Sequence, residues 1–291
     1  METAATGAWI THLFDQFEDR FPTDTLAALS VEGTLAAMAL VLLPDEGDEQ
    51  VARIDGSVHA AHRGRGLGSY ILDWMETRVR RAFEGVGDGK PQIIQTGCAD
   101  HHLDRIALFE KNGFTAVRYS YKMQRDLSQP VSQILLRPDL RTESWSEELD
   151  LPMMHAFNEA FRGAWGVPVM NEALWRQFFT GVPQFRGDLT SLAMSGDAVV
   201  GFCLNWVDAA RNAQTGVKEG WVEAIGVIPE RRGQGVAAAL LSKALQDFIA
   251  LDLERAALDV DAQNPTGALA LYEKLGFEAR KRTILFQKHL D

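Results

Sequence analysis

The pattern of apolar and polar positions changes along the chain and predicts alternating strands and helices. Residues 189–194 and 198–207 are rich in apolar and β-branched residues, and the turn-forming sequence SGD between them predicts a β-hairpin. Residues 236–250 are rich in Ala and Leu and have the pattern of an amphipathic helix. The other elements predicted in this half are strands over 134–137, 221–228, 255–260 and 284–289, and helices over 147–161, 172–179 and 266–275.

An internal repeat of long period relates the two halves of the chain. The block HRGRGLG that begins at His62 matches RRGQGVA from Arg231, and LFEKNGF from Leu108 matches LYEKLGF from Leu271. Two anchors in the same order indicate a duplication. In the first half a single helix-like segment, residues 9–21, precedes the first hairpin, and an opening strand is missing.

Length and the position of a proline define the two copies. A chain of 291 residues is long enough for about two domains of ordinary size. Pro130 stands between a closing and an opening strand pattern, so the boundary is placed there. We therefore predict a shortened, non-catalytic N-terminal domain over 1–129, the first copy, and a catalytic C-terminal domain over 130–291, the second copy.

Composition narrows the class of protein. The net charge of −11, from 29 Lys and Arg against 40 Asp and Glu, argues against nucleic acid as a partner and is compatible with a cationic amine substrate. No apolar run is long enough for a membrane span and no signal sequence is recognised, which predicts a cytoplasmic protein without a membrane partner. Cys98 and Cys203 lie in separate strand-like stretches, so two buried free thiols are expected and no metal site.

The glycine-rich block of each copy stands where a strand must turn into a helix. Gly233 and Gly235 let the backbone approach an anion without a Cβ in the way, and the positive end of a helix dipole lies behind them. Arg231 and Arg232 add positive charge at the rim. A tight turn without a ligand is the alternative explanation, and the loop alone does not decide between the two.

The surroundings of the loop resemble the GNAT superfamily of N-acetyltransferases. The family's pyrophosphate loop reads Gln/Arg-x-x-Gly-x-Gly/Ala, and both Arg232-x-x-Gly235-x-Ala237 and the block that begins at Arg63 satisfy it. In the second copy the resemblance covers most of residues 134–289 and includes the LYEKLGF block. It implies an α/β (α+β) fold of two tandem acyl-CoA N-acyltransferase domains. Each domain would be a mixed, mostly antiparallel splayed sheet flanked by helices.

The resemblance also implies acetyl-CoA as cosubstrate and assigns residues to it. The arm of the cofactor would pair with strand backbone freed where two central strands splay apart. Asn264 would contact that arm, and capping of the following helix would also explain this residue. The cofactor-binding residues expected are Ile225, Gly226, Val227, Arg231, Arg232, Gly233, Gln234, Gly235, Val236, Ala237 and Asn264, with Arg63, Gly64, Arg65, Gly66, Leu67 and Gly68 in the first copy.

Two residues of the second copy are expected to carry the chemistry. Tyr272 follows Asn264 by eight positions, and in resembling enzymes a tyrosine at this spacing protonates the departing thiolate. Glu223 lies two residues before Ile225, where several small-amine acetyltransferases of the family carry a Glu that accepts the amine proton through water. A packing tyrosine and a solvated strand carboxylate are the alternatives to these two roles.

The first copy keeps the loop and loses the expected chemistry. Phe109 stands in place of Tyr272, and Ile54 in place of Glu223; His101 replaces Asn264. The sequence thus predicts transfer of an acetyl group from acetyl-CoA to a primary amine of a small molecule in the second copy, by direct attack. Acetylation of a protein or peptide and a non-catalytic acyl-CoA-binding regulatory protein are the alternatives. The acceptor, the acyl-chain preference and the oligomeric state are not encoded in these patterns.

Overall fold

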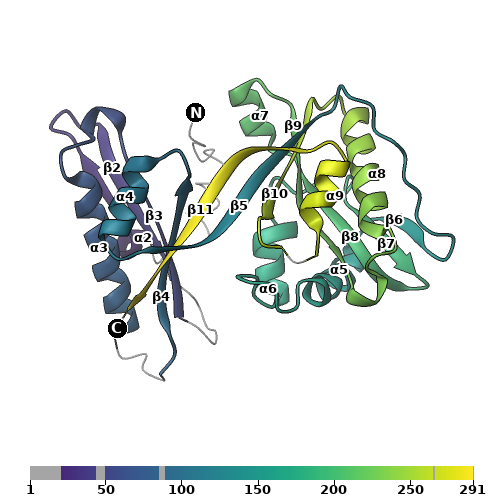
Figure 1. The fold of residues 1–291 in the computed structure, drawn as a ribbon, viewed down its shortest axis with the longest axis horizontal. Coiled ribbons are helices and arrows are strands. Elements are labelled where there is room, and N and C mark those ends of the chain that lie inside the picture. The colour runs from purple at the N-terminus through teal and green to yellow at the C-terminus, as the bar shows by residue number, and fades with distance from the viewer. Residues whose placement is uncertain (1–20, 44–49, 85–88, 265, 291) are drawn as a thin grey trace. The chain divides into compact units, whose positions relative to one another are not determined.

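The computed structural model describes residues 21–43, 50–84, 89–264 and 266–290, and these fall into two compact units (Figure 1). The C-terminal unit comprises residues 122–260 and 264–280, and the N-terminal unit comprises residues 21–121, 261–263 and 281–290. The helix predicted over 9–21 lies outside the described residues apart from its last one.

The sheet of the C-terminal unit is mixed and mostly antiparallel, as predicted. Its order is β10-β9-β8-β7-β6, and the neighbours pair antiparallel except β9 and β10, which pair in parallel. The predicted hairpin forms with Ser195 paired to Ala198, and Gly196 has a φ of +58° that favours glycine. The strands are β6 (Arg141–Ser144), β7 (Ser191–Ser195), β8 (Ala198–Trp206), β9 (Glu219–Val227) and β10 (Arg255–Asp261).

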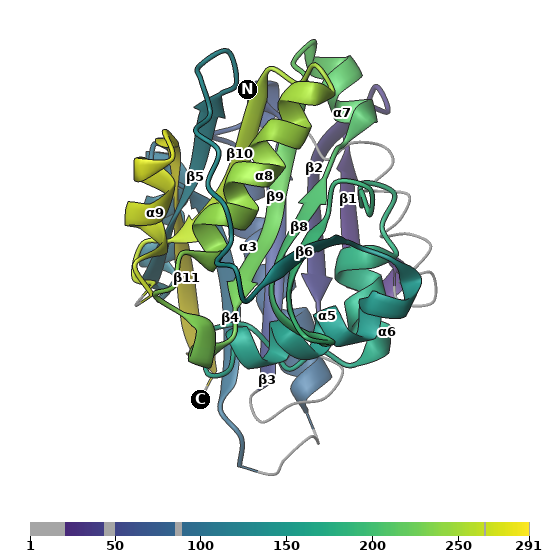
Figure 2. The ribbon, with the colours of Figure 1, turned by 90° about the vertical axis from the view of Figure 1, so that its right-hand side faces the viewer.

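Helices cover both faces of this sheet (Figure 2). Gly201 of β8 faces α8, since a Cβ there would meet Val236 and Leu240. The next residue, Phe202, belongs to the core cluster formed with α5 on the other face, where its ring lies 6.0 Å from that of Phe157. The helices are α5 (Glu147–Ala160), α6 (Glu172–Trp175) with a π-helical turn (Arg176–Thr180), α7 (Ala209–Thr215), α8 (Val236–Ala250) and α9 (Ala268–Lys274).

Two predicted elements of this unit are wrong in position. The opening strand is β6 and not residues 134–137, because the Ile134 N–H donates to Ser242 Oγ of α8 (3.1 Å) instead of to a strand. Helix α9 begins at Ala268 and not at Thr266, because Gly267 adopts a φ of +75°. Helix α7 was not predicted.

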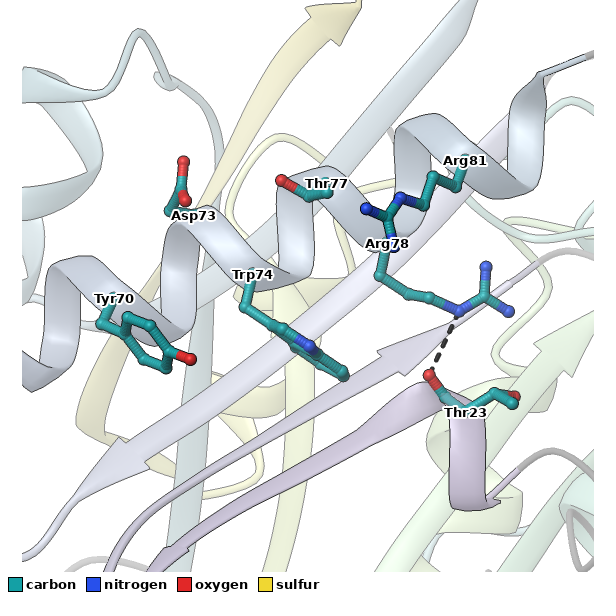
Figure 3. Close-up of a pocket in the computed structure, with 7 residues that line it drawn as sticks. All are labelled: Thr23, Tyr70, Asp73, Trp74, Thr77, Arg78 and Arg81. Atoms are coloured by element: carbon teal, nitrogen blue, oxygen red, sulfur yellow. Dashed lines mark hydrogen bonds between the residues drawn. The ribbon is translucent and has the colours of Figure 1, made fainter.

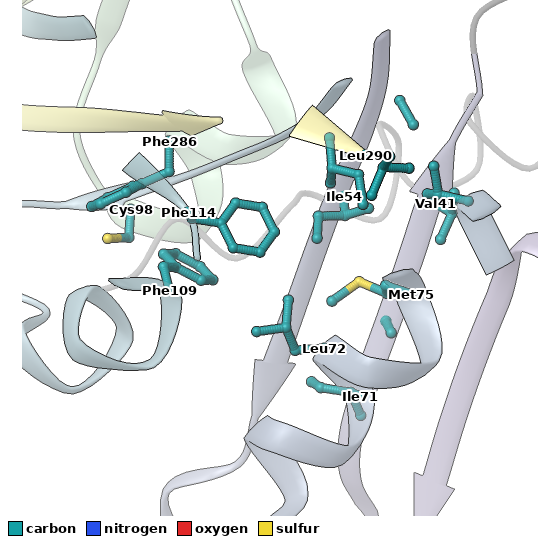
Figure 4. Close-up of a cluster of buried hydrophobic side chains, with 14 of the residues drawn as sticks. Val41, Ile54, Ile71, Leu72, Met75, Cys98, Phe109, Phe114, Phe286 and Leu290 are labelled. Carbon is teal, nitrogen blue, oxygen red and sulfur yellow. The ribbon is translucent and has the colours of Figure 1, made fainter. Parts of the chain in front are cut away.

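The N-terminal unit contains a sheet with the order β1-β2-β3-β4-β11-β5 and has its core on the side of α3. Figure 4 shows this core, in which Ile71, Leu72 and Met75 of α3 are directed toward Ile54 and Val41. The elements are α2 (Phe21–Asp24), β1 (Thr25–Leu29), β2 (Leu35–Leu42), β3 (Gln50–Val58), α3 (Leu67–Phe83), β4 (Gln92–Ala99), α4 (Leu103–Lys111), β5 (Thr115–Asp126) and β11 (Glu278–Leu290).

Each of the two strands that close a copy in sequence ends in the other copy's unit, which the repeat does not predict. Strand β11 closes the second copy in sequence, yet its residues pair antiparallel with β4 of the N-terminal unit, from Thr283 with Ala99 to Leu290 with Gln92. Strand β5 closes the first copy in sequence, yet its end from Lys122 onward belongs to the C-terminal unit. The chain therefore passes between the two compact units at 121/122, and each unit includes the end of the other copy's closing strand. The domain boundary near Pro130 stays a prediction.

Candidate active site

The two glycine loops have nearly the same backbone conformation. Gly233 and Gly64 have φ of +72°, and Gly235 and Gly66 have φ of +80° and +83°. Each loop follows a single 3₁₀ turn, Pro229–Arg231 or Ala60–His62, and leads directly into α8 or α3. A Cβ at any of the four glycines would meet nothing within 4 Å. Glycine is therefore required by the left-handed backbone and not by crowding inside the protein.

Both helices that follow the loops begin without a side-chain cap. The N-cap positions are Gly235 and Gly66, and neither forms a side-chain hydrogen bond. The first N–H groups of a helix have no partner within the helix, and the dipole adds partial positive charge at this end. The loop backbone has the form that a pyrophosphate site needs.

Arg232 and its first-copy counterpart Arg63 hold the strand end in place. Nε of Arg232 donates to the Val227 carbonyl (3.2 Å), and Nε of Arg63 donates to the Val58 carbonyl at the matching position (3.3 Å). Nη2 of Arg232 also donates to the Ala160 carbonyl at the end of α5 (2.7 Å). This guanidinium is engaged with backbone oxygens, and its predicted role as positive charge at the cofactor site stays a prediction.

The neighbouring loop side chains are also engaged. Arg231 forms an ion pair with Asp139 (2.8 Å) and donates to Ser195 Oγ (2.8 Å), so its charge is shared with a carboxylate. Gln234 Nε2 donates to the Glu230 carbonyl (3.1 Å). The loop would therefore bind an anion mainly through its backbone N–H groups, because these side chains already have partners within the protein.

Strands β9 and β10 separate within the sheet. Their parallel pairing runs from Glu219 with Arg255 to Trp221 with Ala257, and no further pair is found between these two fully described strands. The segment Ile225, Gly226 and Val227 pairs with β8 on its other edge. Its edge toward β10 has no strand partner, which leaves backbone groups that an extended ligand can pair with.

Glu223 lies at a β-bulge in β9. Leu204 pairs with Ala224 and Asn205 with Val222, so Glu223 is the extra residue without a partner on β8. Bulges of this kind redirect a side chain, and they occur often beside active sites. In β3 of the first copy the pairing with β2 continues without a shift from Val58 to Arg53.

The partly buried carboxyl of Glu223 has a pKa suited to proton exchange near neutrality. Burial and, to a smaller extent, the charge of Asp259 on β10 raise its pKa, a hydrogen bond from the Trp221 side chain partly offsets both, and the net result is a pKa raised from 4.5 to about 7. Asp259 and Trp221 were not singled out in the sequence. The pairing of β9 with β10 could have pointed to Asp259, because this residue follows the last residue of β10 that pairs with β9 by two positions.

Tyr272 on α9 is buried, and its ring centroid lies 6.1 Å from that of Phe277. Burial raises the pKa of the phenol, and the Cys203 thiol acts in the same direction. The hydroxyl therefore stays protonated at physiological pH and is able to donate. In the first copy Phe109 packs in the same way against Phe114 (5.8 Å) without a hydroxyl.

Asn264 does not cap α9, which corrects one of its two predicted explanations. Its side-chain oxygen accepts from the Thr266 N–H (2.9 Å) and hydroxyl (2.6 Å), which forms a local turn before the helix begins at Ala268. The capping position is Gly267. Its contact with a cofactor remains a prediction.

Both cysteines are buried and free, as the sequence predicted. No group of three or more His, Cys, Asp or Glu side chains able to hold a metal ion is found within the described ranges. Nor does any helix in the described part of the chain have the length and apolar character to cross a membrane.

An open groove of about 560 Å³ lies on α3 of the N-terminal unit (Figure 3). Arg78 connects α3 to α2 through a hydrogen bond to the Thr23 carbonyl (3.2 Å) and an ion pair with Asp24 (2.6 Å). The groove shares no residue with either glycine loop. Its lining residues are Thr23, Tyr70, Asp73, Trp74, Thr77, Arg78 and Arg81.

Comparison with known proteins agrees with this geometry. Residues 2–114 and 151–277 match the model of the Acetyltransferase (GNAT) family. The chain is 28% identical over 280 residues to the mycothiol acetyltransferase of Thermobispora bispora, covering 91% of this chain and 88% of that protein. It is 26% identical over 269 residues to that of Rothia mucilaginosa, covering 84% and 73%.

Solved structures share the fold over nearly the whole chain. A GCN5-related N-acetyltransferase from Sphaerobacter thermophilus superposes with a TM-score of 0.77 at 23% identity, covering 96% of this chain and 85% of that one. A tandem GNAT protein from the clavulanic acid biosynthesis pathway gives 0.71 at 16% identity, covering 91% and 82%. Two family matches along one chain, with the tandem fold, establish that this protein belongs to the GNAT family and is an acetyltransferase.

Proposed function

We propose that the second copy transfers an acetyl group from acetyl-CoA to a primary amine of a small molecule. The observation that carries the proposal is the bulge in β9, which sets apart a carboxyl of pKa about 7 on the strand that leads into the glycine loop. The same unit holds a protonated phenol at Tyr272. Amine acetylation requires one group that accepts a proton and one group that donates a proton.

The loop and the unpaired edge of β9 fit acetyl-CoA. The left-handed glycines and the uncapped start of α8 suit the pyrophosphate. Residues 225–227 suit the pantetheine arm, because their backbone is unpaired on the side of β10. The first copy has the same loop and is proposed to bind acyl-CoA without turnover.

The transfer step follows from the two titratable groups. Glu223, when ionised, takes a proton from the substrate ammonium through water and so frees the nitrogen lone pair. Model amines have a pKa near about 10, so most substrate arrives protonated. The amine attacks the thioester carbonyl carbon, the C–S bond breaks, and the thiolate takes the proton of Tyr272. The acetylated nitrogen then loses its extra proton, which restores the phenol of Tyr272 through water. No covalent enzyme intermediate is needed.

A small-molecule acceptor is favoured by the relatives and by the charge of the chain. Relatives of similar length are mycothiol acetyltransferases, and the architecture resembles mycothiol synthase. The net charge of −11 favours a cationic amine over an anionic partner.

The candidate residues for the acceptor side are Asn158, Phe161, Trp165, Trp175 and Phe178, and they lie in different surroundings. Trp175 is fully buried, where its indole donates to Asp150 (3.0 Å), and Asn158 binds the backbone of Met170 through both side-chain atoms. Trp165 is exposed at the surface. Phe178 is exposed as well, so Trp165 and Phe178 are the two residues proposed to contact the acceptor.

A screen of amines for acetyl-CoA-dependent release of the CoA thiol tests this function. The panel contains aminosugar-linked cysteine amines, simple diamines and lysine-containing peptides, and the Tyr272→Phe protein serves as the control. We expect turnover with at least one small amine and a much lower rate in the control. Turnover with peptides alone would overturn the choice of acceptor, and no turnover with any amine would overturn the function.

A further inference from the structure

Arg125 is a buried cation that the chemistry above leaves unused. It lies near the end of β5, the strand that closes the first copy in sequence, but belongs to the C-terminal unit. The side chain is almost fully buried and burial lowers its pKa, against which the charge of Asp126 acts. No ion pair within 4 Å is found for it among the described residues. A buried guanidinium without a carboxylate is costly, so its hydrogen-bond partners are informative.

Three backbone carbonyls surround this guanidinium. Nη1 donates to the Leu275 carbonyl, and Nη2 donates to the carbonyls of Pro130 (2.7 Å) and Gln129 (3.4 Å). Leu275 is the C-cap residue of α9, where the helix dipole is negative and carbonyls lack helical partners. Gly276, with φ of +82°, makes room, since a Cβ there would collide with Arg125. The arginine thus joins the residues that follow β5 to the end of α9.

The turn that Arg125 holds also fixes Tyr272. The Phe277 N–H donates to the Tyr272 carbonyl (3.0 Å), the Gly276 N–H donates to the Glu273 carbonyl (2.9 Å), and the Phe277 ring packs on the tyrosine ring. Tyr272 lies three residues before Leu275, about one turn of the helix. A shift of this turn would therefore carry the phenol with it.

The N-terminal unit offers a natural comparison. Lys288 on β11 stands at the position of Arg125 in the repeat, by the same offset that relates Tyr272 to Phe109. It forms an ion pair with Glu76 of α3 (2.6 Å) and lies 5.5 Å from the centre of the Phe114 ring. Within the described residues no bond from Lys288 to the carbonyls that end α4 is found. The contacts between a buried cation and the carbonyls at a helix end thus occur in the unit that has the tyrosine.

We propose that Arg125 is a positioning residue that holds α9 so that the Tyr272 hydroxyl meets the departing thiolate. This inference rests on the proposed function. It implies that the strand closing the first copy supplies part of the catalytic apparatus of the second, so the site is incomplete without it. A catalytic domain cut at residue 130 would lack both the end of β5 and this arginine.

The test is a double-mutant cycle between Arg125→Met and Tyr272→Phe, with Lys288→Met as the matched control. We expect Arg125→Met to lower kcat by about 10- to 100-fold, as misplacement of a catalytic group does, with KM for acetyl-CoA changed less than about 3-fold. In the Tyr272→Phe background the same substitution should lower kcat no further, because the hydroxyl it positions is gone. Lys288→Met should leave kcat unchanged.

Each other outcome of the cycle has a definite meaning. Wild-type kcat in folded Arg125→Met, or a fall that multiplies with that of Tyr272→Phe, would overturn the positioning role. If Arg125→Met does not fold, Arg125→Lys replaces it, since lysine keeps the charge and loses the planar fork; the same non-additivity is expected. A wild-type rate in Tyr272→Phe alone would instead overturn the proposed chemistry, which separates the two failures.

Discussion

The two copies have almost the same phosphate loop but different surroundings for catalysis. The glycine φ values agree within a few degrees, and Arg63 and Arg232 make the same bond to the strand end. The copies differ at the bulge, which only β9 has at the compared position, and at the hydroxyl, which Tyr272 has and Phe109 lacks. The glycine loop depends mainly on backbone conformation, so few residues have to be retained for it. Catalysis depends on a few particular side chains and on one register shift in β9.

The largest expected effect comes from exchanging Tyr272 on α9 and Phe109 on α4, which occupy matching positions in the two copies. Tyr272→Phe keeps the ring packing and removes the proton donor, so kcat should fall by about 10²- to 10⁴-fold with little change in cofactor affinity. The reverse exchange, Phe109→Tyr, should add no turnover, because Ile54 and an unbulged β3 remain. Steady-state kinetics and thermal melting measure both. Should Tyr272→Phe melt lower yet keep the wild-type rate, Tyr272 serves packing alone.

The roles of the two glycine loops can be distinguished by replacing one glycine of each loop with glutamate. Gly235→Glu forces a side chain into a left-handed conformation and sets a negative charge before α8, so acetyl-CoA should bind about 10- to 100-fold more weakly at that site. Gly66→Glu makes the same change in the first copy and should leave turnover intact. Calorimetry counts the sites and gives both affinities. Loss of all turnover in folded Gly66→Glu, with the second loop still binding, would show that the first copy is catalytically needed.

Glu223 should set the pH dependence of the active copy. The wild-type kcat/KM should rise as the pH increases through about 7, because Glu223 acts as a base only when ionised. Glu223→Gln should lower kcat/KM by about 10-fold or more and remove this rise, leaving the dependence that the amine itself imposes. Ile54→Gln is the control at the matching position. An unchanged rise near pH 7 in Glu223→Gln would assign the titration to another group.

The smallest expected effect is on stability. The pKa of Glu223 is raised in the folded state, to about 7 from 4.5, so its contribution to stability is fully present below pH 4.5 and is lost as the pH rises through 7. Glu223→Gln cannot ionise, so relative to wild type it should gain about 2 kcal/mol between pH 4 and pH 8, reduced by the partial exposure of the carboxyl. Urea unfolding at both values measures this. An equal difference at both values would contradict the raised pKa.

Local patterns were sufficient for most elements of the C-terminal unit. Helix α8 has the predicted ends, and the hairpin of β7 and β8 forms around its turn signal. Both depend on residues close together in sequence, namely helical periodicity and a glycine in a two-strand turn. The prediction of an opening strand over 134–137 was wrong, although these residues are apolar enough for a strand. Ser242, more than one hundred positions away, binds the Ile134 N–H instead.

The sequence by itself determined the duplication, the glycines that only a left-handed loop requires, and the loss of Tyr272 and Glu223 counterparts in the first copy. Tertiary structure decided which unit each closing strand completes, where the register of β9 shifts, and which carbonyls hold Arg125. The physical reason is the range of the interactions. Backbone conformation and periodicity are set by neighbours along the chain, while strand pairing, bulges and the partners of a buried cation depend on segments that only folding brings together.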